Sequence, residues 1–263
     1  MPIHEVTLAD VYHLDFGRRT EDLMMWTALA HLAPAGSVLD VGCGDGRATR
    51  DLIQLGRPVL GFDPNGKFNH LARINYLVTP TSDEATLTAD YPESYHWARM
   101  VNKGAGFSLV VCAYSTLWLM PHIRQATAIT LMAEALLPGG VLAIEVFIPE
   151  YTENRVVDSP CCDPNDPTRP PWVRRSTFRI NHALRRTEIT RLYGPVPEQW
   201  TMRLEETVYW RDPADLLMLA RRAGLSSAEV LTGPAVLGQF GEGGVRARSI
   251  PVAKGHALLV CSR

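Results

Sequence analysis

Residues 38–46 read VLDVGCGDG, an apolar run that passes directly into glycines at alternate positions. The run predicts a short buried strand, and the helical pattern over 47–55 predicts a helix immediately after the turn. Glycines let a backbone turn sharply and approach a ligand, and a helix N-terminus offers free N–H groups to an anion. The next apolar run, PVLGF at 58–62, is followed by Asp63, which lies 19 residues after Gly44. An aspartate at that point holds ribose hydroxyls in nucleotide-binding sheets, so we expect an adenosine-containing cofactor here.

The turn departs from the fingerprint of dinucleotide-binding proteins. That fingerprint, G-x-G-x-x-G, requires a glycine where this chain has Arg47. Asp40 and Asp45 would also repel a pyrophosphate, whereas a carboxylate at position 40 can meet an α-amino group. A nicotinamide-dependent reductase is therefore only a distant alternative.

Apolar strand-like runs alternate with helical patterns along the first 150 residues. Strands are expected at 37–41, 58–62, 85–89, 107–113 and 141–147, and helices at 20–33, 47–55, 66–77 and 121–137. Continuous apolar strands separated by helices predict a parallel sheet that is covered on both faces. We therefore predict an α/β, Rossmann-like, doubly wound fold with a mostly parallel sheet of seven strands, of which the last two lie near 227–231 and 256–261.

The pattern changes after the fifth predicted strand. Residues 151–171 are rich in proline and predict a long loop of the kind that often forms a lid. Three runs with a period near two follow, at 172–181, 184–193 and 200–210, and predict an antiparallel meander. We expect three consecutive parts: 1–150 as an N-terminal helical segment with the cofactor-binding core, 151–210 as lid loop and antiparallel insertion, and 211–263 as the last helix and closing strands.

Composition narrows the class of protein. The 263 residues are 46% hydrophobic and 21% charged, with a formal net charge of -2, which argues against a nucleic-acid binder. The sequence contains no run of 18 apolar residues, so no membrane-spanning helix is expected. Residues 1–15 lack the basic-then-apolar pattern of a signal peptide. The five cysteines show no C-x-x-C spacing, so we expect reduced thiols, no metal site and a cytoplasmic location.

Three segments carry a resemblance to a known family. The run VLDVGCGDGRATRDLIQLGRPVLGFDPN at 38–65 resembles motif I and the second strand of class I S-adenosylmethionine (SAM)-dependent methyltransferases. FSLVVCAYSTLWLM at 107–120 and LLPGGVLAIEVF at 136–147 resemble the fourth and fifth strands of that family. The resemblance covers about residues 10–150 and, more weakly, the last 50, and it implies SAM as cofactor and S-adenosylhomocysteine as product.

The resemblance implies a role for each residue around the cofactor. Gly42 and Gly44 would line its methionine part, Asp40 would lie near the amino group, and Asp63 would hold the ribose hydroxyls. Asp90 would accept from the adenine amino group, although a surface-loop acid is the other interpretation. The full set of expected cofactor-binding residues is Asp40, Gly42, Gly44, Asp63, Pro64, Asp90, Tyr91 and Cys112.

Three residues are candidates for binding or deprotonating a substrate. Glu145 ends the fifth predicted strand; the alternative is a carboxylate paired with a nearby arginine. Tyr12 could cover the cofactor or bond substrate, or it could simply pack the N-terminal segment. His122 follows the fourth-strand loop and could be a base, or a surface histidine at a helix start.

Two kinds of sequence feature indicate which class of molecule accepts the methyl group: motifs that are absent after the fourth strand, and the segments inserted after the fifth. The chain has neither an N/D-P-P-Y-like segment nor a Pro-Cys pair after the fourth strand, which argues against adenine-N6 and cytosine-C5 methyltransferases. The lid and meander resemble those of bacterial natural-product and amino-sugar methyltransferases. We therefore expect methyl transfer to an O, N or C atom of a small metabolite in bacterial secondary metabolism. A SAM-fold protein with a non-methylating reaction of the cyclase or decarboxylase kind is the alternative, followed by an RNA methyltransferase, and the sequence leaves a homodimer open.

The positively charged residues are almost all arginines rather than lysines. Only three are lysines (Lys67, Lys103 and Lys254), so 23 are arginines. Six arginines lie within the predicted meander: Arg174, Arg175, Arg179, Arg185, Arg186 and Arg191. GC-rich codon usage and a solvated outer face explain them most simply, but arginines that point inward would indicate an anionic substrate.

Overall fold

The computed structural model describes residues 12–13, 15–16, 20, 22–63, 65, 68, 106–148, 153–161, 172–195, 199–237, 248–252, 254 and 256–263. The chain divides into two compact units. The core unit comprises residues 20–148 and 211–263, and the insertion unit comprises residues 1–19 and 149–210. The predicted helix at 66–77 and the predicted strand at 85–89 fall almost wholly outside the described residues.

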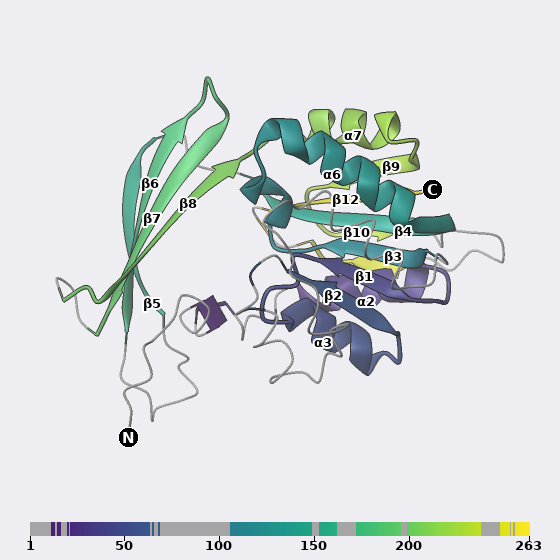
Figure 1. Cartoon of the computed structure of the whole chain (residues 1–263), viewed down its shortest axis with the longest axis horizontal. Coiled ribbons are helices and arrows are strands. Elements are labelled where there is room, and N and C mark those ends of the chain that lie inside the picture. The colour runs from purple at the N-terminus through teal and green to yellow at the C-terminus, as the bar shows by residue number, and fades with distance from the viewer. Residues whose placement is uncertain are drawn as a thin grey trace. The chain divides into compact units, whose positions relative to one another are not determined.

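The core unit is built on a mainly parallel sheet (Figure 1). Within the described residues the strand order is β2-β1-β3-β4-β12-β9. The strands are β1 (Val38–Val41), β2 (Val59–Phe62), β3 (Phe107–Cys112), β4 (Leu136–Phe147), β9 (Ser226–Leu231) and β12 (His256–Ser262). β1 to β4 pair in parallel, and β12 runs antiparallel to both of its neighbours. β1 and β3 are buried along their whole length, as expected of continuous apolar runs covered on both faces.

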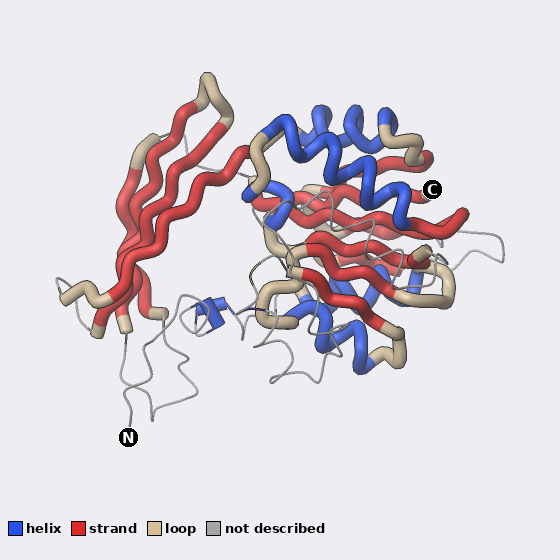
Figure 2. Tube along the Cα trace, viewed as in Figure 1, coloured by secondary structure: helices blue, strands red, loops and turns tan. Residues whose placement is uncertain are grey.

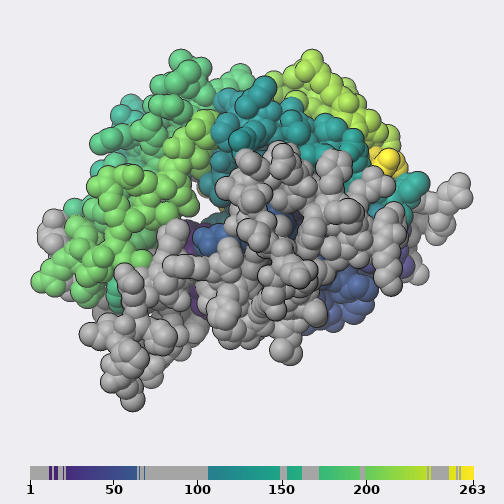
Figure 3. Space-filling model, viewed as in Figure 1, coloured from purple at the N-terminus to yellow at the C-terminus, as the bar shows by residue number. Residues whose placement is uncertain are grey.

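Helices cover both faces of this sheet (Figure 2). α6 (His122–Ala135) and α7 (Pro213–Arg222) lie side by side on one face (Figures 1 and 3). α2 (Leu23–Leu32) and α3 (Arg47–Gln54) cover the other, where Trp26, Leu52 and Val111 share one buried core. A short hairpin that the sequence did not predict, β10 (Ala235–Leu237) with β11 (Arg248–Ile250), packs into the same core.

Two element boundaries differ from those expected. The helix predicted over 121–137 ends at Ala135, and β4 begins at once with Leu136, which pairs with Phe107. The Pro138-Gly139-Gly140 segment, which precedes the strand predicted at 141–147, lies inside β4, where the register with β3 shifts. Pairing with a neighbouring strand overrides the local turn signal here, and a bulge accommodates the proline.

The insertion unit is a separate four-stranded antiparallel sheet with the order β5-β6-β7-β8. β6 (Val173–Asn181), β7 (Arg186–Gly194) and β8 (Met202–Tyr209) match the predicted meander. The expectation of a loop throughout 151–171 was wrong, because β5 (Arg155–Pro160) pairs with β6. β5 is an edge strand with alternating burial, and an edge strand tolerates the proline at its end.

No helix in the described part of the chain is long and apolar enough to span a membrane. Four cysteines are described, at 43, 112, 161 and 261, and all are buried and free of disulfide bonds. Among the described residues, no group of three or more His, Cys, Asp or Glu side chains is placed to hold a metal ion.

Candidate cofactor and substrate site

Several of the polar residues that were predicted from the sequence to form the site lie at the carboxyl ends of the core-sheet strands. Because β1, β3 and β4 are parallel and paired at Asp40 with Val111 and at Cys112 with Ile144, their carboxyl ends lie together. β12 is antiparallel, so its first residues lie at the same edge. Ligands of open α/β sheets bind outside the carboxyl ends of the strands. This edge is therefore where a cofactor should bind.

The glycine-rich turn has a backbone conformation that favours glycine at three positions. Gly42, Gly44 and Gly46 have φ of 70°, 57° and 88°, a region that favours glycine. A Cβ on Gly42 would overlap the methyl group of Thr116 and lie 2.6 Å from its hydroxyl oxygen. The N–H groups of Gly42 and Cys43 both donate to the carbonyl of Phe62, at 2.7 and 2.9 Å. The turn is thus fixed onto the end of β2 and presents bare backbone.

Asp40 is a fully buried carboxyl group with one unpartnered oxygen. Its Oδ2 accepts from the Thr49 hydroxyl at 2.5 Å. Its Oδ1 is buried and has no hydrogen-bond partner within the described part of the chain. Burial raises the pKa of Asp40 to about 6, against the opposing effect of the Thr49 hydrogen bond. A buried oxygen without a donor costs free energy, so the site fits a ligand that brings a donor such as an ammonium group.

Asp63 is held by backbone donors from two sides. Gly44 N–H donates to Oδ2 at 3.1 Å and Asn65 N–H donates to Oδ1 at 2.8 Å. The carboxyl group is 8% exposed, and burial raises its pKa to about 6. The two backbone donors fix the orientation of this carboxyl group, and a carboxylate is an acceptor suited to a pair of neighbouring hydroxyls.

A buried ion pair beside the turn was missed by the sequence reasoning. Arg47 makes two parallel hydrogen bonds to Asp22, one of them from Nη2 at 2.8 Å, and Trp26 Nε1 donates to the same carboxylate at 3.0 Å. The Arg47 guanidinium also lies 5.2 Å from the ring centre of Tyr114. Burial alone would raise the pKa of Asp22, but the hydrogen bonds and charge of Arg47 outweigh it and hold the pKa below its usual value. The pair ties the start of α3 to the start of α2.

This pair also changes the predicted helix start. The helix predicted over 20–33 begins later than expected: α2 begins at Leu23, and Asp22 is its N-cap residue. The Asp22 side chain makes no capping bond because Arg47 and Trp26 occupy it. No local signal could have shown this, since 25 residues separate the two partners.

Glu145 is 1% exposed and both of its oxygens are engaged. Oε2 accepts from the backbone N–H of Tyr114 at 3.0 Å, and Oε1 lies 2.9 Å from Nδ1 of His256. Tyr114 and Ser115 have φ of 50° and 63°, so Glu145 stabilises a turn in the left-handed region. The partner is a histidine rather than the arginine considered from the sequence.

The other candidates are placed less directly. His122 is the first residue of α6, and its carbonyl accepts from Arg211 Nη2 at 2.9 Å. Tyr12 belongs to the insertion unit, where its ring lies 4.8 Å from that of Phe16. Cys112 is fully buried at the end of β3, and burial raises its pKa. Pro64, Asp90 and Tyr91 lie outside the described residues, so their roles stay predictions.

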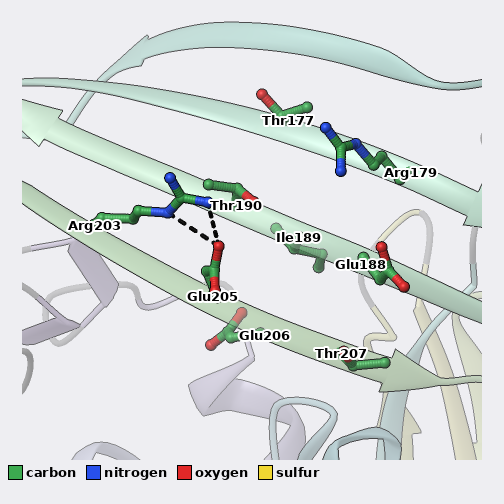
Figure 4. Close-up of a pocket in the computed structure, with 9 residues that line it drawn as sticks. All are labelled: Thr177, Arg179, Glu188, Ile189, Thr190, Arg203, Glu205, Glu206 and Thr207. Atoms are coloured by element: carbon green, nitrogen blue, oxygen red, sulfur yellow. Dashed lines mark hydrogen bonds and ion pairs between the residues drawn. The ribbon is translucent and has the colours of Figure 1, made fainter.

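Most meander arginines are paired with carboxylates. The ion pairs are Arg174–Asp15, Arg175–Asp158, Arg186–Glu188 and Arg191–Glu206. Arg179 lines a hollow of about 290 Å³ on the antiparallel sheet, together with Glu188, Glu205 and Glu206 (Figure 4). Arg203 on the same surface is paired with Glu205 (Figure 4). The hollow thus has a mixed charge rather than the positive charge of an anion site.

Residues 38–140 match a protein family described as a methyltransferase domain. Two curated relatives are ubiquinone biosynthesis O-methyltransferases. That of Paraburkholderia phytofirmans is 32% identical over 114 residues, which are 43% of this chain and 44% of that protein. That of Xanthomonas axonopodis pv. citri is 31% identical over 120 residues, which are 45% of this chain and 46% of that protein. The matched stretch therefore spans less than half the length of each relative.

Solved structures resemble the chain over nearly its whole length. DesVI from Streptomyces venezuelae is 20% identical, with 98% of this chain and 99% of that chain covered and a TM-score of 0.67. The sugar N-methyltransferase KedS8 from Streptoalloteichus sp. is 18% identical, with 100% and 96% covered and a TM-score of 0.66. These likenesses confirm the predicted Rossmann-like fold.

Proposed function

We propose that this chain, whose residues 38–140 match a methyltransferase domain, transfers the methyl group of SAM to an oxygen, nitrogen or carbon atom of a small metabolite. One observation carries the proposal. At the carboxyl edge of a Rossmann-like sheet, Asp40 holds a buried oxygen without a donor, next to a bare glycine turn that is itself bonded to Asp63. The amino group of SAM matches the unpartnered oxygen of Asp40, its methionine part matches the bare glycine turn, and its ribose hydroxyls match Asp63.

The chain's own residues would bind and orient the cofactor. Asp40 would accept from the amino group, Gly42 and Gly44 would allow close approach, and Asp63 would accept from both ribose hydroxyls. Pro64, Asp90 and Tyr91 are proposed for the adenosine end. SAM supplies a methyl group without bonding electrons: the acceptor's lone pair forms the new bond, and the carbon–sulfur pair stays on sulfur, giving S-adenosylhomocysteine. The protein's contribution is alignment and exclusion of water, which is worth several kcal/mol.

The acceptor class is proposed from the names of the similar proteins. They include O-methyltransferases of ubiquinone biosynthesis, a sugar N-methyltransferase and an amino pentose methyltransferase. A hydroxyl or amino group of a small metabolite is consistent with each of these. A role in bacterial secondary metabolism is proposed from the sugar methyltransferases among them. An anionic acceptor, a homodimer and a cytoplasmic location are further proposals. The carboxylate partners of four meander arginines weaken the first of them.

A binding experiment tests the cofactor first. We expect SAM and S-adenosylhomocysteine, but not NADH, to raise the melting temperature of the full chain, because only ligands of the native state stabilise it. Stabilisation by NADH alone would overturn the proposal.

A labelling experiment then tests transfer. The chain is incubated with methyl-tritiated SAM and glucosamine, 3,4-dihydroxybenzoate or a small-molecule extract of bacterial cells, with total RNA as a separate arm. Label in a small molecule is expected. Label only in nuclease-sensitive material would indicate an RNA methyltransferase. SAM binding with no labelled product in any arm would favour a non-methylating reaction.

A further inference from the structure

We infer that His256 is the general base that accepts the acceptor's proton, and that Glu145 is the positioning residue that orients it. The inference rests on the proposed function and deepens it. The sequence pattern indicates Glu145 or His122 for this role and carries no signal for His256.

His256 lies at the cofactor edge because of strand topology. It is the first residue of β12 and pairs with Phe147, the last residue of β4. Side chains on one strand alternate between faces, so Glu145 and Phe147 share a face, and His256 shares it as the cross-strand partner of Phe147. The registers between β1, β3 and β4 place Asp40 on this face as well. The histidine, Glu145 and the proposed cofactor ligand thus occupy one side of one sheet edge.

The two ring nitrogens of His256 have different surroundings. Nδ1 is buried and lies 2.9 Å from Oε1 of Glu145. Nδ1 makes no hydrogen bond within the described part of the chain, so its contact with Glu145 is electrostatic rather than a hydrogen bond. The side chain is 24% exposed, and Nδ1 rather than Nε2 is its buried nitrogen without a hydrogen-bond partner. The negative charge of Glu145 beside Nδ1 favours a proton on that nitrogen by electrostatic attraction, and a neutral ring then carries its lone pair on Nε2.

Few other charged or titratable groups face this histidine. The Tyr114 ring, from the turn after β3, lies 6.5 Å from the imidazole ring. Arg47 lies 5.2 Å from the same tyrosine ring. On β9, the strand on the other side of β12, Glu229 pairs with Val260 rather than with His256. Glu145 is therefore the direct charged partner among the described residues.

This arrangement divides the work between the two side chains. Glu145 cannot reach an acceptor itself, because it is 1% exposed and Oε2 is bonded to Tyr114 N–H. As the acceptor's lone pair forms its bond to the methyl carbon, the O–H or N–H proton moves to Nε2 of His256. The imidazolium that results is stabilised by the Glu145 carboxylate and later releases its proton to water. The same logic of nucleophile, base and orienting carboxylate operates in other enzymes that activate hydroxyl groups.

Nitrogen-15 NMR of the histidine rings tests the positioning without any acceptor. In the full chain bound to S-adenosylhomocysteine, we expect neutral His256 to carry its proton on Nδ1. The Glu145→Gln variant should lose this preference. A neutral ring with the proton on Nε2, unchanged by Glu145→Gln, would overturn the inference.

Kinetics with an acceptor labelled in the assay above provide the second test. We expect His256→Gln to lower kcat by about 10²–10⁴-fold, the usual worth of a general base, while the Kd for SAM changes less than about twofold. The wild-type rise of kcat/KM with pH should disappear, and added imidazole should partly restore His256→Ala. His31→Gln, at an exposed position on α2, is the matched control and should behave as wild type.

The failure of this inference differs from the failure of the proposed function. If His256→Gln transfers methyl groups at the wild-type rate and with the wild-type pH profile, His256 is not the general base, but the proposed methyltransferase activity still stands. If the wild-type chain does not bind SAM, the proposed methyltransferase function itself is contradicted. If His256→Gln does not fold, His256→Asn and the NMR measurement on the wild-type chain still decide the question.

Discussion

Gly44 donates its backbone N–H to Oδ2 of Asp63 at 3.1 Å, across 19 residues of chain. The bond joins the turn after β1 to the end of β2, so the two parts of the expected cofactor site hold each other in place. Binding and local stability are therefore coupled at this edge.

Replacing Asp63 with alanine should weaken SAM binding about 10- to 100-fold. The change removes the proposed ribose acceptor and leaves the N–H groups of Gly44 and Asn65 without their partner. Isothermal titration with SAM measures the effect. Glu134→Ala, at an exposed position on α6, should leave the Kd unchanged. Equal affinity in Asp63→Ala and wild type would exclude Asp63 from the site.

Two glycine substitutions separate backbone strain from steric overlap. Gly56→Ala, at φ 74° with nothing within 4 Å of the added carbon, should cost about 1–2 kcal/mol of unfolding free energy. Gly42→Ala, at φ 70°, adds the overlap with Thr116 and should cost clearly more, by about a further 1–3 kcal/mol. Urea denaturation of both variants measures the difference. Equal costs would mean that Thr116 moves freely away.

The buried acids predict that stability falls as pH rises from about 4 to 6. Asp40 and Asp63 have folded-state pKa values of about 6, raised by burial from 3.8. In this window the folded chain binds more protons than the unfolded chain, so their contribution is fully present below pH 4 and is lost as pH approaches 6. Asp40→Asn should therefore gain stability relative to wild type at pH 7 compared with pH 4.5. Denaturation curves at both pH values test this, and an unchanged difference would contradict it.

Cofactor affinity should have the opposite pH dependence. The amino group of SAM is cationic at these pH values, and it interacts favourably only with the ionised form of Asp40. The Kd for SAM should fall as pH rises from about 5 to 7, and this slope should be smaller in Asp40→Asn. Titration calorimetry across this range provides the measurement. An identical slope in the two proteins would place the amino group elsewhere.

Removing one partner of the buried pair beside the turn should be costly. Asp22→Ala leaves the Arg47 guanidinium buried without its carboxylate, and we expect a loss of about 3–5 kcal/mol. Breaking the pair Arg203–Glu205, whose side chains are each 64% exposed, should change stability by less than about 1 kcal/mol. Thermal or urea unfolding of Asp22→Ala and Glu205→Ala compares them directly. Similar small losses would show that Arg47 finds another partner.

Much of the fold could be predicted from local pattern. The apolar run at 38–41, the glycines after it and the helical spacing from Arg47 all act within a few residues, and each appears as expected. The meander was also foreseen, because a period of two persists through β6, β7 and β8. β5 and the early start of β4 were not foreseen, since both depend on pairing with a neighbouring strand that no local pattern names.

The sequence by itself determined the strand–turn–helix unit, the acid after the second strand and the fold class, because backbone preferences and side-chain periodicity act over short distances. Only the tertiary structure decided which charges meet. It paired Arg47 with Asp22, set His256 beside Glu145, and gave most meander arginines a carboxylate partner. Arg47 and Asp22, and likewise His256 and Glu145, are distant in the chain, and helix packing and strand register fix their contacts. The sequence pattern therefore predicted the cofactor site, but it could not predict that His256 lies beside Glu145, where we propose that it acts as the general base.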